Sequence, residues 1–217
     1  MAFFMNKILL ITRPKHDITV HYLFYWAKQI IELAKSKSIS VLDLKEKRAN
    51  RREVSSMLQK KEPLLVFFNG HGDNNCVKGH DNETLLAVGE NEQLLISKIV
   101  YSLSCRSGKD LGPKSIQSGA LGYLGYDDDF IFFIEDDKIS SPLEDKTAKL
   151  FLEASNQVMI SLIKGHTIKE SYERSKNIFR ENVLRLATSE SQDSYLIQFL
   201  IWDMQHQVCL GEENVHF

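Results

Sequence analysis

Two short, continuously apolar segments constrain most strongly what this chain can fold into. They cover residues 64–68 and 99–103, and both are rich in β-branched or aromatic side chains. Strands that read as continuous apolar runs are typical of parallel sheets that are covered on both faces. Each segment leads into a chemically reactive side chain, His71 in the first case and Cys105 in the second. Because parallel strands end at the same edge of a sheet, where open α/β folds bind their ligands, we expect these two side chains to lie side by side.

The remaining segments alternate between strand-like and helix-like patterns. Besides the two central runs, strands are predicted at 7–12, 38–44, 120–123, 130–134 and 207–210. Helices are predicted at 17–34, 46–61, 107–117, 143–164, 167–187 and 190–203. Strands that alternate with helices predict an α/β fold, and right-handed crossovers limit it to a doubly wound, mostly parallel sheet with helices on both faces.

Composition and charge narrow the class of protein. The chain of 217 residues is 43% hydrophobic and carries a net charge of −2, with a pI near 6.4. These values argue against a dedicated binder of nucleic acid or of anionic membranes, so neither is expected as a partner. Three cysteines without a CxxC pair indicate a reducing compartment rather than a disulfide framework. Lys7 interrupts the apolar N-terminal stretch, no small-residue cleavage site follows, and we therefore expect a cytoplasmic protein.

The sequence around His71 and Cys105 is suited to thiol chemistry. A histidine beside a cysteine is the minimum equipment for nucleophilic catalysis by a thiol. Gly72 follows His71 and lets a substrate backbone approach closely. A helix that began at Ser107 would favour the thiolate of Cys105 over the thiol. The backbone N–H groups of Gly72 and Cys105 are the expected donors to the oxyanion of an acyl-transfer intermediate.

These residues carry a family resemblance. A strand followed by His71-Gly72, and then a strand followed by Ser104-Cys105, resembles the caspase-like cysteine peptidases of the gingipain, separase and metacaspase clan, and in particular their bacterial CHAT-type relatives. The stretch 118–126 is similar to the strand after the nucleophile loop in that group, and 207–212 is similar to its closing segment. Leu103 stands where metacaspases carry an acidic residue, which argues against metacaspase-like specificity.

The resemblance implies a caspase-like fold and an activity. Cys105 would be the nucleophile and His71 the general acid or base of a thiol protease, which hydrolyses peptide bonds through a thioester intermediate. The whole chain, residues 1–217, would form a single peptidase domain, with a catalytic segment at about 60–130 and a helical part at about 143–217. The expected partners are a protein or peptide substrate and a regulatory partner protein. No cofactor and no metal are expected.

Several charged residues are candidates for substrate binding. Arg13 ends the first predicted strand, where it resembles the arginine with which caspases bind acidic P1 side chains. The acidic loop Asp127, Asp128 and Asp129 offers a site for a basic P1 side chain instead. Asp73, beside the His71 loop, is a candidate to orient the imidazole or to bind substrate. Each of these positions is equally compatible with a surface charge or a solvated turn.

The same residues are compatible with other functions. The first alternative is a zinc site formed by His71, Cys76, His80 and Cys105. The spacings between these residues match no common zinc-ligand pattern. The basic run 45–52 lacks interleaved aromatic residues and is typical of a solvated helix face. A catalytically silent caspase-like interaction or signalling module, and a thiol amidase or acyltransferase acting on a small substrate, stay open as alternatives to a peptidase.

Overall fold

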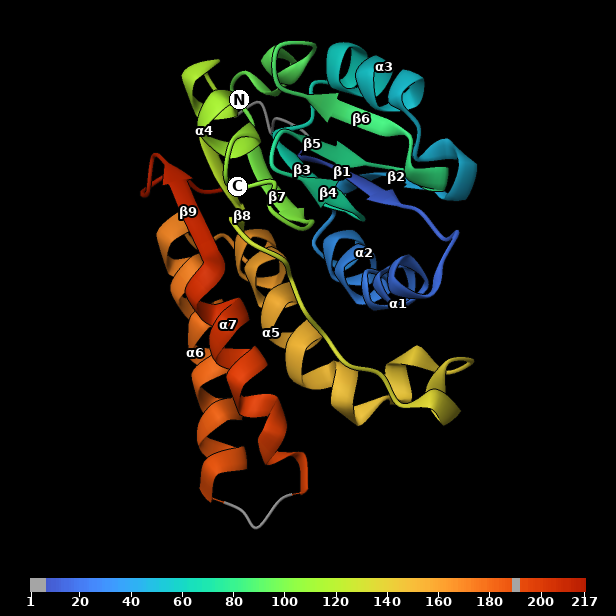
Figure 1. Cartoon of the computed structure of the whole chain (residues 1–217). Coiled ribbons are helices and arrows are strands. Elements are labelled where there is room, and N and C mark those ends of the chain that lie inside the picture. Colours follow the sequence, from blue (N-terminus) through green and yellow to red (C-terminus); the bar gives the residue numbers. More distant parts are fainter. Residues whose placement is uncertain (1–6, 189–191) are drawn as a thin grey trace.

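The computed structural model describes residues 7–188 and 192–217, and a six-stranded sheet lies at its centre (Figure 1). The strands are β1 (Ile8–Arg13), β2 (Ser40–Lys45), β3 (Leu65–Asn69), β7 (Ile99–Leu103), β8 (Gly122–Tyr126) and β9 (Gln207–Gly211). Their order across the sheet is β2-β1-β3-β7-β8-β9. All neighbours pair in parallel except β9, which runs antiparallel to β8. The predicted mostly parallel α/β sheet is therefore confirmed.

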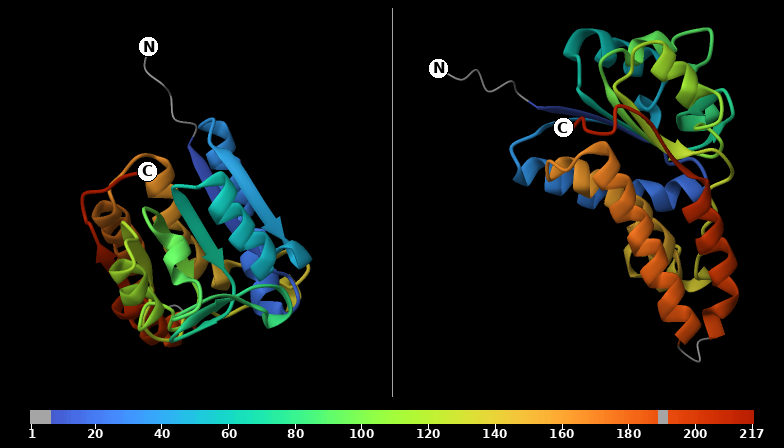
Figure 2. Two further views of the ribbon diagram at one scale, coloured as in Figure 1. Left: turned by 90° about the horizontal axis from the view of Figure 1, so that it is seen from above. Right: turned by 90° about the vertical axis from the view of Figure 1, so that its left-hand side faces the viewer.

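Helices cover both faces of the sheet (Figure 2). On one face lie α1 (Ile18–Trp26), α2 (Lys28–Ser36) and α5 (Lys146–Ile163). On the other lie α3 (Arg51–Lys61) and α4 (Leu111–Gln117). The last two helices, α6 (Ile168–Thr188) and α7 (Ile197–His206), pack against each other and extend beyond the sheet (Figure 2). A small antiparallel sheet follows β3 along the chain and is formed by β4 (Gly72–Asp73), β5 (Cys76–Lys78) and β6 (Thr84–Ala87).

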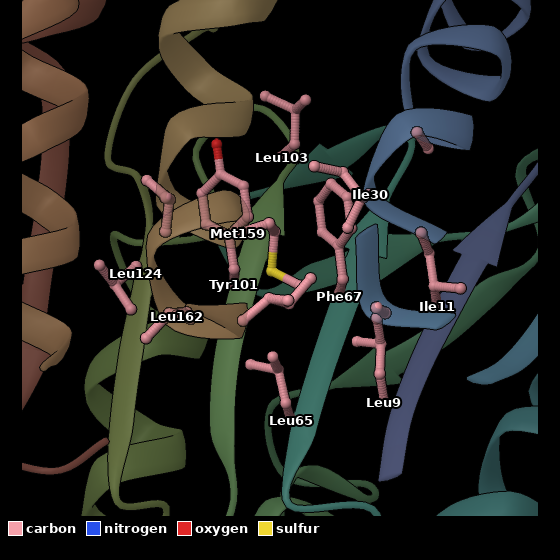
Figure 3. Packing of buried hydrophobic residues seen from close by; sticks show 14 of the residues in the cluster. Leu9, Ile11, Ile30, Leu65, Phe67, Tyr101, Leu103, Leu124, Met159 and Leu162 are labelled. Carbon is pink, nitrogen blue, oxygen red and sulfur yellow. The ribbon is translucent and has the colours of Figure 1, made fainter. Parts of the chain in front are cut away.

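The two faces explain why the central strands are apolar throughout. Side chains alternate between the faces of a strand, and Phe67 and Tyr101 point toward the face of α1, α2 and α5 (Figure 3). Val66 and Val100 point the other way, into a cluster that includes side chains of α3 and α4. Both faces of β3 and β7 are buried, so neither strand has a position that must be polar.

Several predicted elements are placed differently. The helix predicted at 17–34 is divided at Ala27 into α1 and α2. The helix predicted at 46–61 starts as a short 3-10 turn, Glu46–Arg48, and α3 begins only after Asn50, whose side chain accepts a hydrogen bond from the Glu53 N–H. The predicted helix at 190–203 begins in the undescribed residues 189–191, and α7 itself starts at Ile197.

Two differences affect the candidate site directly. The segment after Cys105 turns instead of starting a helix at Ser107, and α4 begins only at Leu111. The segment 130–134 is not a strand, because β9 pairs with β8 and occupies the edge that this segment would need.

Residues 1–6 lie outside the described part of the chain, so the expectation about the N-terminal stretch stays a prediction. Within the described residues, we found no helix with the length and apolarity that crossing a bilayer requires.

Replacement of Phe67 by alanine tests the packing between the sheet and its helices. The Phe67 ring is fully buried and stacks on Tyr101, with 5.1 Å between the ring centroids. Phe67→Ala should lower the free energy of unfolding by about 3–5 kcal/mol, because it leaves a cavity in the core. Phe67→Leu keeps most of the volume and should cost less than about 1.5 kcal/mol. Urea unfolding followed by circular dichroism measures both, and equal stability of the two variants would contradict the packing.

Candidate active site

The pairing of β3 with β7 brings His71 and Cys105 to neighbouring positions. Asn69 pairs with Leu103 at the carboxyl ends of the two strands, and the Gly70 N–H donates a hydrogen bond to the Leu103 carbonyl oxygen at 3.2 Å. His71 and Cys105 each follow these paired residues by the same number of positions. The structure thus places them at the same edge of the sheet, as predicted from the two apolar runs.

Gly72 holds the two chain segments in close contact. A Cβ atom at this position would lie 2.8 Å from the Cys105 carbonyl oxygen and 2.8 Å from the Ser104 Cβ. Neither of these atoms is the free end of a flexible side chain, so any larger residue would force the segments apart. The absence of a side chain at Gly72 therefore sets how near the His71 loop comes to Cys105.

Asp17 is a partner of His71 that sequence reasoning missed. It lies in the loop between β1 and α1, and its Oδ2 is 2.6 Å from the Nε2 of His71. A carboxylate only accepts hydrogen bonds, so the proton of this contact lies on Nε2, which in the neutral ring leaves the lone pair on Nδ1. Burial works to raise the pKa of Asp17, but hydrogen bonds from the Val20 N–H and from His71 together lower that pKa below its usual value. Asp17 is thus a charged group that orients the imidazole.

The second carboxylate oxygen of Asp17 starts helix α1. Its Oδ1 accepts a hydrogen bond from the Val20 N–H at 3.0 Å, which is an N-cap arrangement. One side chain therefore fixes the start of a helix and the orientation of His71. The contact with His71 joins residues far apart in the chain, so no local sequence signal marks it.

The Cys105 thiol rests as a neutral group. Its Sγ lies 3.9 Å from the carbonyl oxygen of Phe130, in the extended segment that crosses the site. Burial raises the pKa of the Cys105 thiol to about 11, and the negative charge of Asp129 acts in the same direction. The expected help from a helix that starts at Ser107 is absent, since α4 begins later. Proton transfer must therefore accompany any attack by this thiol.

The turn after Cys105 is fixed by the acidic loop. Arg106 has a left-handed backbone, with φ of 58°, which is uncommon for a residue with a side chain. Its N–H donates to the carbonyl oxygen of Asp128 at 3.0 Å, and its guanidinium lies 2.6 Å from the Asp129 carboxylate. These contacts hold the Cys105 turn against residues 127–129.

Two backbone N–H groups beside Cys105 are free of hydrogen bonds to the neighbouring strand or loop in the described residues. The Cys105 N–H has no acceptor among the residues that the structure describes. Gly72 pairs with Val77, and the flanking hydrogen bond runs from the Lys78 N–H to the His71 carbonyl oxygen. This is the pattern of a non-hydrogen-bonded pair, in which N–H groups point away from the partner strand. The Gly72 N–H therefore faces away from β5, and the Cα of Gly72 lies next to Ser104 and Cys105.

Arg13 is engaged in contacts inside the protein. Its guanidinium donates to both carboxylate oxygens of Asp43, at 2.9 and 2.5 Å, and to the Phe24 carbonyl oxygen at 3.1 Å. It also covers the ring of Phe24, at 4.3 Å from the centroid. The side chain is only 6% exposed. These contacts describe a residue that joins β1, β2 and α1, rather than one that presents charge to a ligand.

The predicted acidic residues separate into two groups. Asp127 accepts a hydrogen bond from the His206 ring at 2.8 Å, and Asp129 is paired with Arg106. Asp128 accepts a hydrogen bond from the Asp129 N–H, lies at a longer 3.9 Å from the Arg106 guanidinium, and is partly exposed. Asp73 is exposed, and its Oδ1 accepts from the Asn74 N–H. Asp128 and Asp73 are thus the least engaged carboxylates near Cys105.

The zinc set considered from the sequence does not assemble as such. Cys76 lies buried in β5, and desolvation raises the pKa of its thiol, which opposes metal binding as thiolate. The ligand atoms that do gather in the described residues belong to two groups centred on another histidine. They are His16, Asp17 and His71 in one group, and His16, His80 and Asp81 in the other. His16 is a candidate metal ligand that the sequence did not indicate, because no sequence motif surrounds it and only the three-dimensional structure brings it close to the other ligands.

Comparisons with known proteins bear on the fold. No protein-family profile and no curated protein sequence matches the chain. Among solved structures, it is similar to a chain in the complex of the pro- and mature domains of RgpB from Porphyromonas gingivalis, with a TM-score of 0.60 and 8% sequence identity. The chain has a caspase-like α/β fold. RgpB is a gingipain, a cysteine peptidase. The match covers 97% of this chain and 48% of that one, so the chain spans about half the length of its structural neighbour.

The glycine after His71 provides a test of this geometry. Gly72→Ala should destabilise the protein by about 1–3 kcal/mol, because the added methyl group overlaps backbone and Cβ atoms of the Cys105 segment. It should also change the rate at which an alkylating reagent modifies Cys105. Gly89→Ala is the control: Gly89 has φ of 78° and open space around it, so the variant strains the backbone away from the site. If both variants change Cys105 reactivity equally, the close approach at Gly72 is not what positions the thiol.

The pH dependence of thiol labelling tests the neutral state of Cys105. Burial raises the pKa of Cys105 and of Cys209 to about 11 each, so both remain protonated at neutral pH. Because only the thiolate reacts, iodoacetamide labelling of either residue should increase about tenfold per pH unit between pH 7 and 10. Peptide mass spectrometry measures the two rates separately. A labelling rate of Cys105 that levels off below pH 8 would contradict a neutral resting thiol.

Proposed function

We propose that the chain is a cysteine peptidase in which Cys105 is the nucleophile, His71 the general base and acid, and Asp17 the residue that orients His71. One observation carries the proposal: the neighbouring ends of β3 and β7 bear His71 and Cys105, and His71 is held by a carboxylate at 2.6 Å. A nucleophile, a base and a third group that orients the base make up the arrangement used by unrelated hydrolases. The fold similarity to a gingipain is consistent with this chemistry.

The proposed reaction begins with a peptide bound across the edge of the sheet. Nδ1 of His71 takes the proton of the Cys105 thiol while Sγ attacks the carbonyl carbon. The N–H groups of Gly72 and Cys105 stabilise the oxyanion that forms. The C–N bond then breaks, His71 gives its proton to the leaving amine, and a thioester remains on Cys105. Water, deprotonated by His71, hydrolyses the thioester and restores the thiol.

Substrate entry would have to release Cys105 from its resting contact. The thiol faces the Phe130 carbonyl oxygen in the free protein, whereas attack requires it to face His71 and the substrate. In this proposal, a bound peptide displaces the thiol from Phe130, so the nucleophile forms only when substrate is present. This account reconciles a thiol pKa of about 11 with catalysis near neutral pH.

For the P1 side chain, the proposal favours a basic residue. Asp73 and Asp128 lie near the Cys105 turn with carboxylates that are less engaged than those of Asp127 and Asp129, and both electrostatically favour a cation. Arg13 is assigned a structural role, since its guanidinium is bound to Asp43.

A second function is favoured by one observation. The buried, protonated state of Cys105 is also what a catalytically silent interaction module of this fold would have. The two functions differ in their response to a peptide carrying an electrophilic acyloxymethyl ketone. A peptidase forms a covalent thioether on Cys105, and a silent module does not.

Removal of the nucleophile tests the peptidase activity. Wild-type protein should cleave members of a fluorogenic peptide library, and Cys105→Ala should lose this activity by at least about 10³-fold, since it removes the attacking atom. Cys209→Ala is the matched control, because this thiol has a similar pKa and lies in β9, outside the proposed site. Cleavage retained by Cys105→Ala, or absent from wild type across the library, would overturn the proposal.

Two substitutions of Asp17 separate its two roles. Asparagine is as good an N-cap as aspartate, so Asp17→Asn should change the free energy of unfolding by less than about 0.5 kcal/mol. It removes the charge that orients His71 and should lower kcat about 10²- to 10⁴-fold. Asp17→Ala should additionally lose about 0.5–2 kcal/mol of stability, because the cap is gone. If Asp17→Asn hydrolyses peptides at the wild-type rate, Asp17 does not orient the base.

A further inference from the structure

His16 has a largely buried imidazole that makes no hydrogen bond within the described part of the chain. Its side chain is 11% exposed, and neither Nδ1 nor Nε2 has a hydrogen-bond partner among the described residues, although both atoms are shielded from solvent. An unsatisfied buried polar group is costly, so such a group in a native structure calls for a partner that the protein chain does not supply. Two other imidazoles lie against it: the ring centroids of His71 and His80 are 5.9 and 5.3 Å away.

The groups around His16 form two candidate sets of metal ligands. In each set, the ligand atoms all lie within 4.8 Å of one another. Asp17 Oδ2 is 3.6 Å from His16 Nε2 and 2.6 Å from His71 Nε2. Ligand atoms around a tetrahedral zinc ion, each at about 2.0–2.2 Å from the metal, are about 3.3 Å apart. Small side-chain rotations therefore bring this first set to zinc geometry.

Hydrogen bonding disfavours the second set. The Nδ1 of His80 accepts a hydrogen bond from the Lys15 N–H at 3.3 Å, so the proton of a neutral His80 ring resides on Nε2. That nitrogen then has no lone pair for a metal, although it is the one that faces Asp81. The His71 ring is different, because its Nε2 shares its proton with a carboxylate and a metal ion can take that proton's place.

We propose that His16, Asp17 and His71 bind one zinc ion, with a fourth position left to water. Two imidazoles and one carboxylate with an open position are a common ligand set for Zn²⁺. The ion would supply the missing partner of His16. His16 and Asp17 also line a surface cavity of about 290 Å³ together with Ile18 and His21, which provides a path for the ion from solvent.

Zinc at this site would switch the peptidase off, an effect that rests on the proposed function. Binding at Nε2 replaces the proton shared with Asp17, and the neutral ring then carries its proton on Nδ1. A protonated Nδ1 has no lone pair and cannot accept the proton of the Cys105 thiol. The same ion occupies the Asp17 carboxylate that orients the base. Inhibition therefore requires His16, a residue with no part in the proposed hydrolysis.

Metal binding is tested without relying on activity. The full chain carrying Cys105→Ala is stripped with a chelator and titrated with Zn²⁺ in competition with a chromophoric chelator. We expect one zinc ion per chain, and at least a tenfold loss of affinity in the same protein with His16→Gln. His80→Gln is the matched control and should change affinity less than threefold. Absence of stoichiometric binding, or equal affinity with and without His16, would overturn the site, as would a loss of binding confined to His80→Gln.

Two further measurements identify the zinc ligands independently of the affinity of His16→Gln. Co²⁺ in place of Zn²⁺ should give a tetrahedral visible spectrum without thiolate charge transfer, whereas a thiolate band would assign the metal to Cys76 or Cys209 and refute the site. If His16→Gln does not fold, ¹⁵N NMR of the histidine rings in the unsubstituted protein decides the matter. Zinc should shift the ring nitrogens of His16 and His71 but not those of His80, and the reverse pattern would refute the proposal.

Inhibition separates the metal site from the proposed function. Zinc should reduce peptide cleavage by wild-type protein at least tenfold relative to its own zinc-free rate, and that ratio should fall below threefold in His16→Gln. Stoichiometric zinc binding by a protein that cleaves no peptide would support the site and refute the peptidase. Peptide cleavage by a protein that binds no zinc would support the peptidase and refute the zinc site.

Discussion

The parallel pairing of β3 with β7 is the constraint on which the candidate site depends. In its register, Asn69 lies opposite Leu103, so the two strands end at the same edge of the sheet. His71 and Cys105, two residues further along each segment, are therefore neighbours. The register is stabilised by packing on both faces, because a shift by one residue would move the large rings of Phe67 and Tyr101 to the face where Val66 and Val100 now fit. Packing in the core therefore positions His71 and Cys105 at the edge of the sheet.

A second constraint joins the site to the helices. Asp17 caps α1 through one carboxylate oxygen and holds His71 through the other. The orientation of the imidazole is thus coupled to the start of a helix whose side chains are buried against the sheet. His16, directly before the cap, is brought beside His71 by the same loop. A single turn after β1 contributes to the proposed hydrolysis and to the proposed zinc site.

The sequence predicted the parts of the molecule that depend on local pattern. The apolar runs at 64–68 and 99–103 identified the central strands, and their ends identified His71 and Cys105 as neighbours. Contacts between distant segments could not be predicted from the sequence, because they produce no local sequence pattern. Examples are the Asp17–His71 hydrogen bond, the Arg13–Asp43 ion pair and the contact of the Cys105 thiol with Phe130. The helix predicted from Ser107 failed for a related reason, since long-range contacts of Arg106 with the acidic loop set that turn. The segment 130–134 does not form the predicted strand, because β9 pairs with β8 at that edge of the sheet. Which of two segments pairs with an edge strand depends on tertiary structure and not on local sequence.

The central claim is that Cys105 attacks a peptide carbonyl whose oxygen is held by Gly72 and Cys105. A crystal structure of the protein with a peptide aldehyde, chosen from the best-cleaved library sequence, tests it directly. The account predicts a bond from Cys105 Sγ to the aldehyde carbon, the oxygen about 3 Å from both N–H groups, and the thiol released from Phe130. A peptide bound elsewhere, or an unmodified Cys105 still facing Phe130, would contradict it.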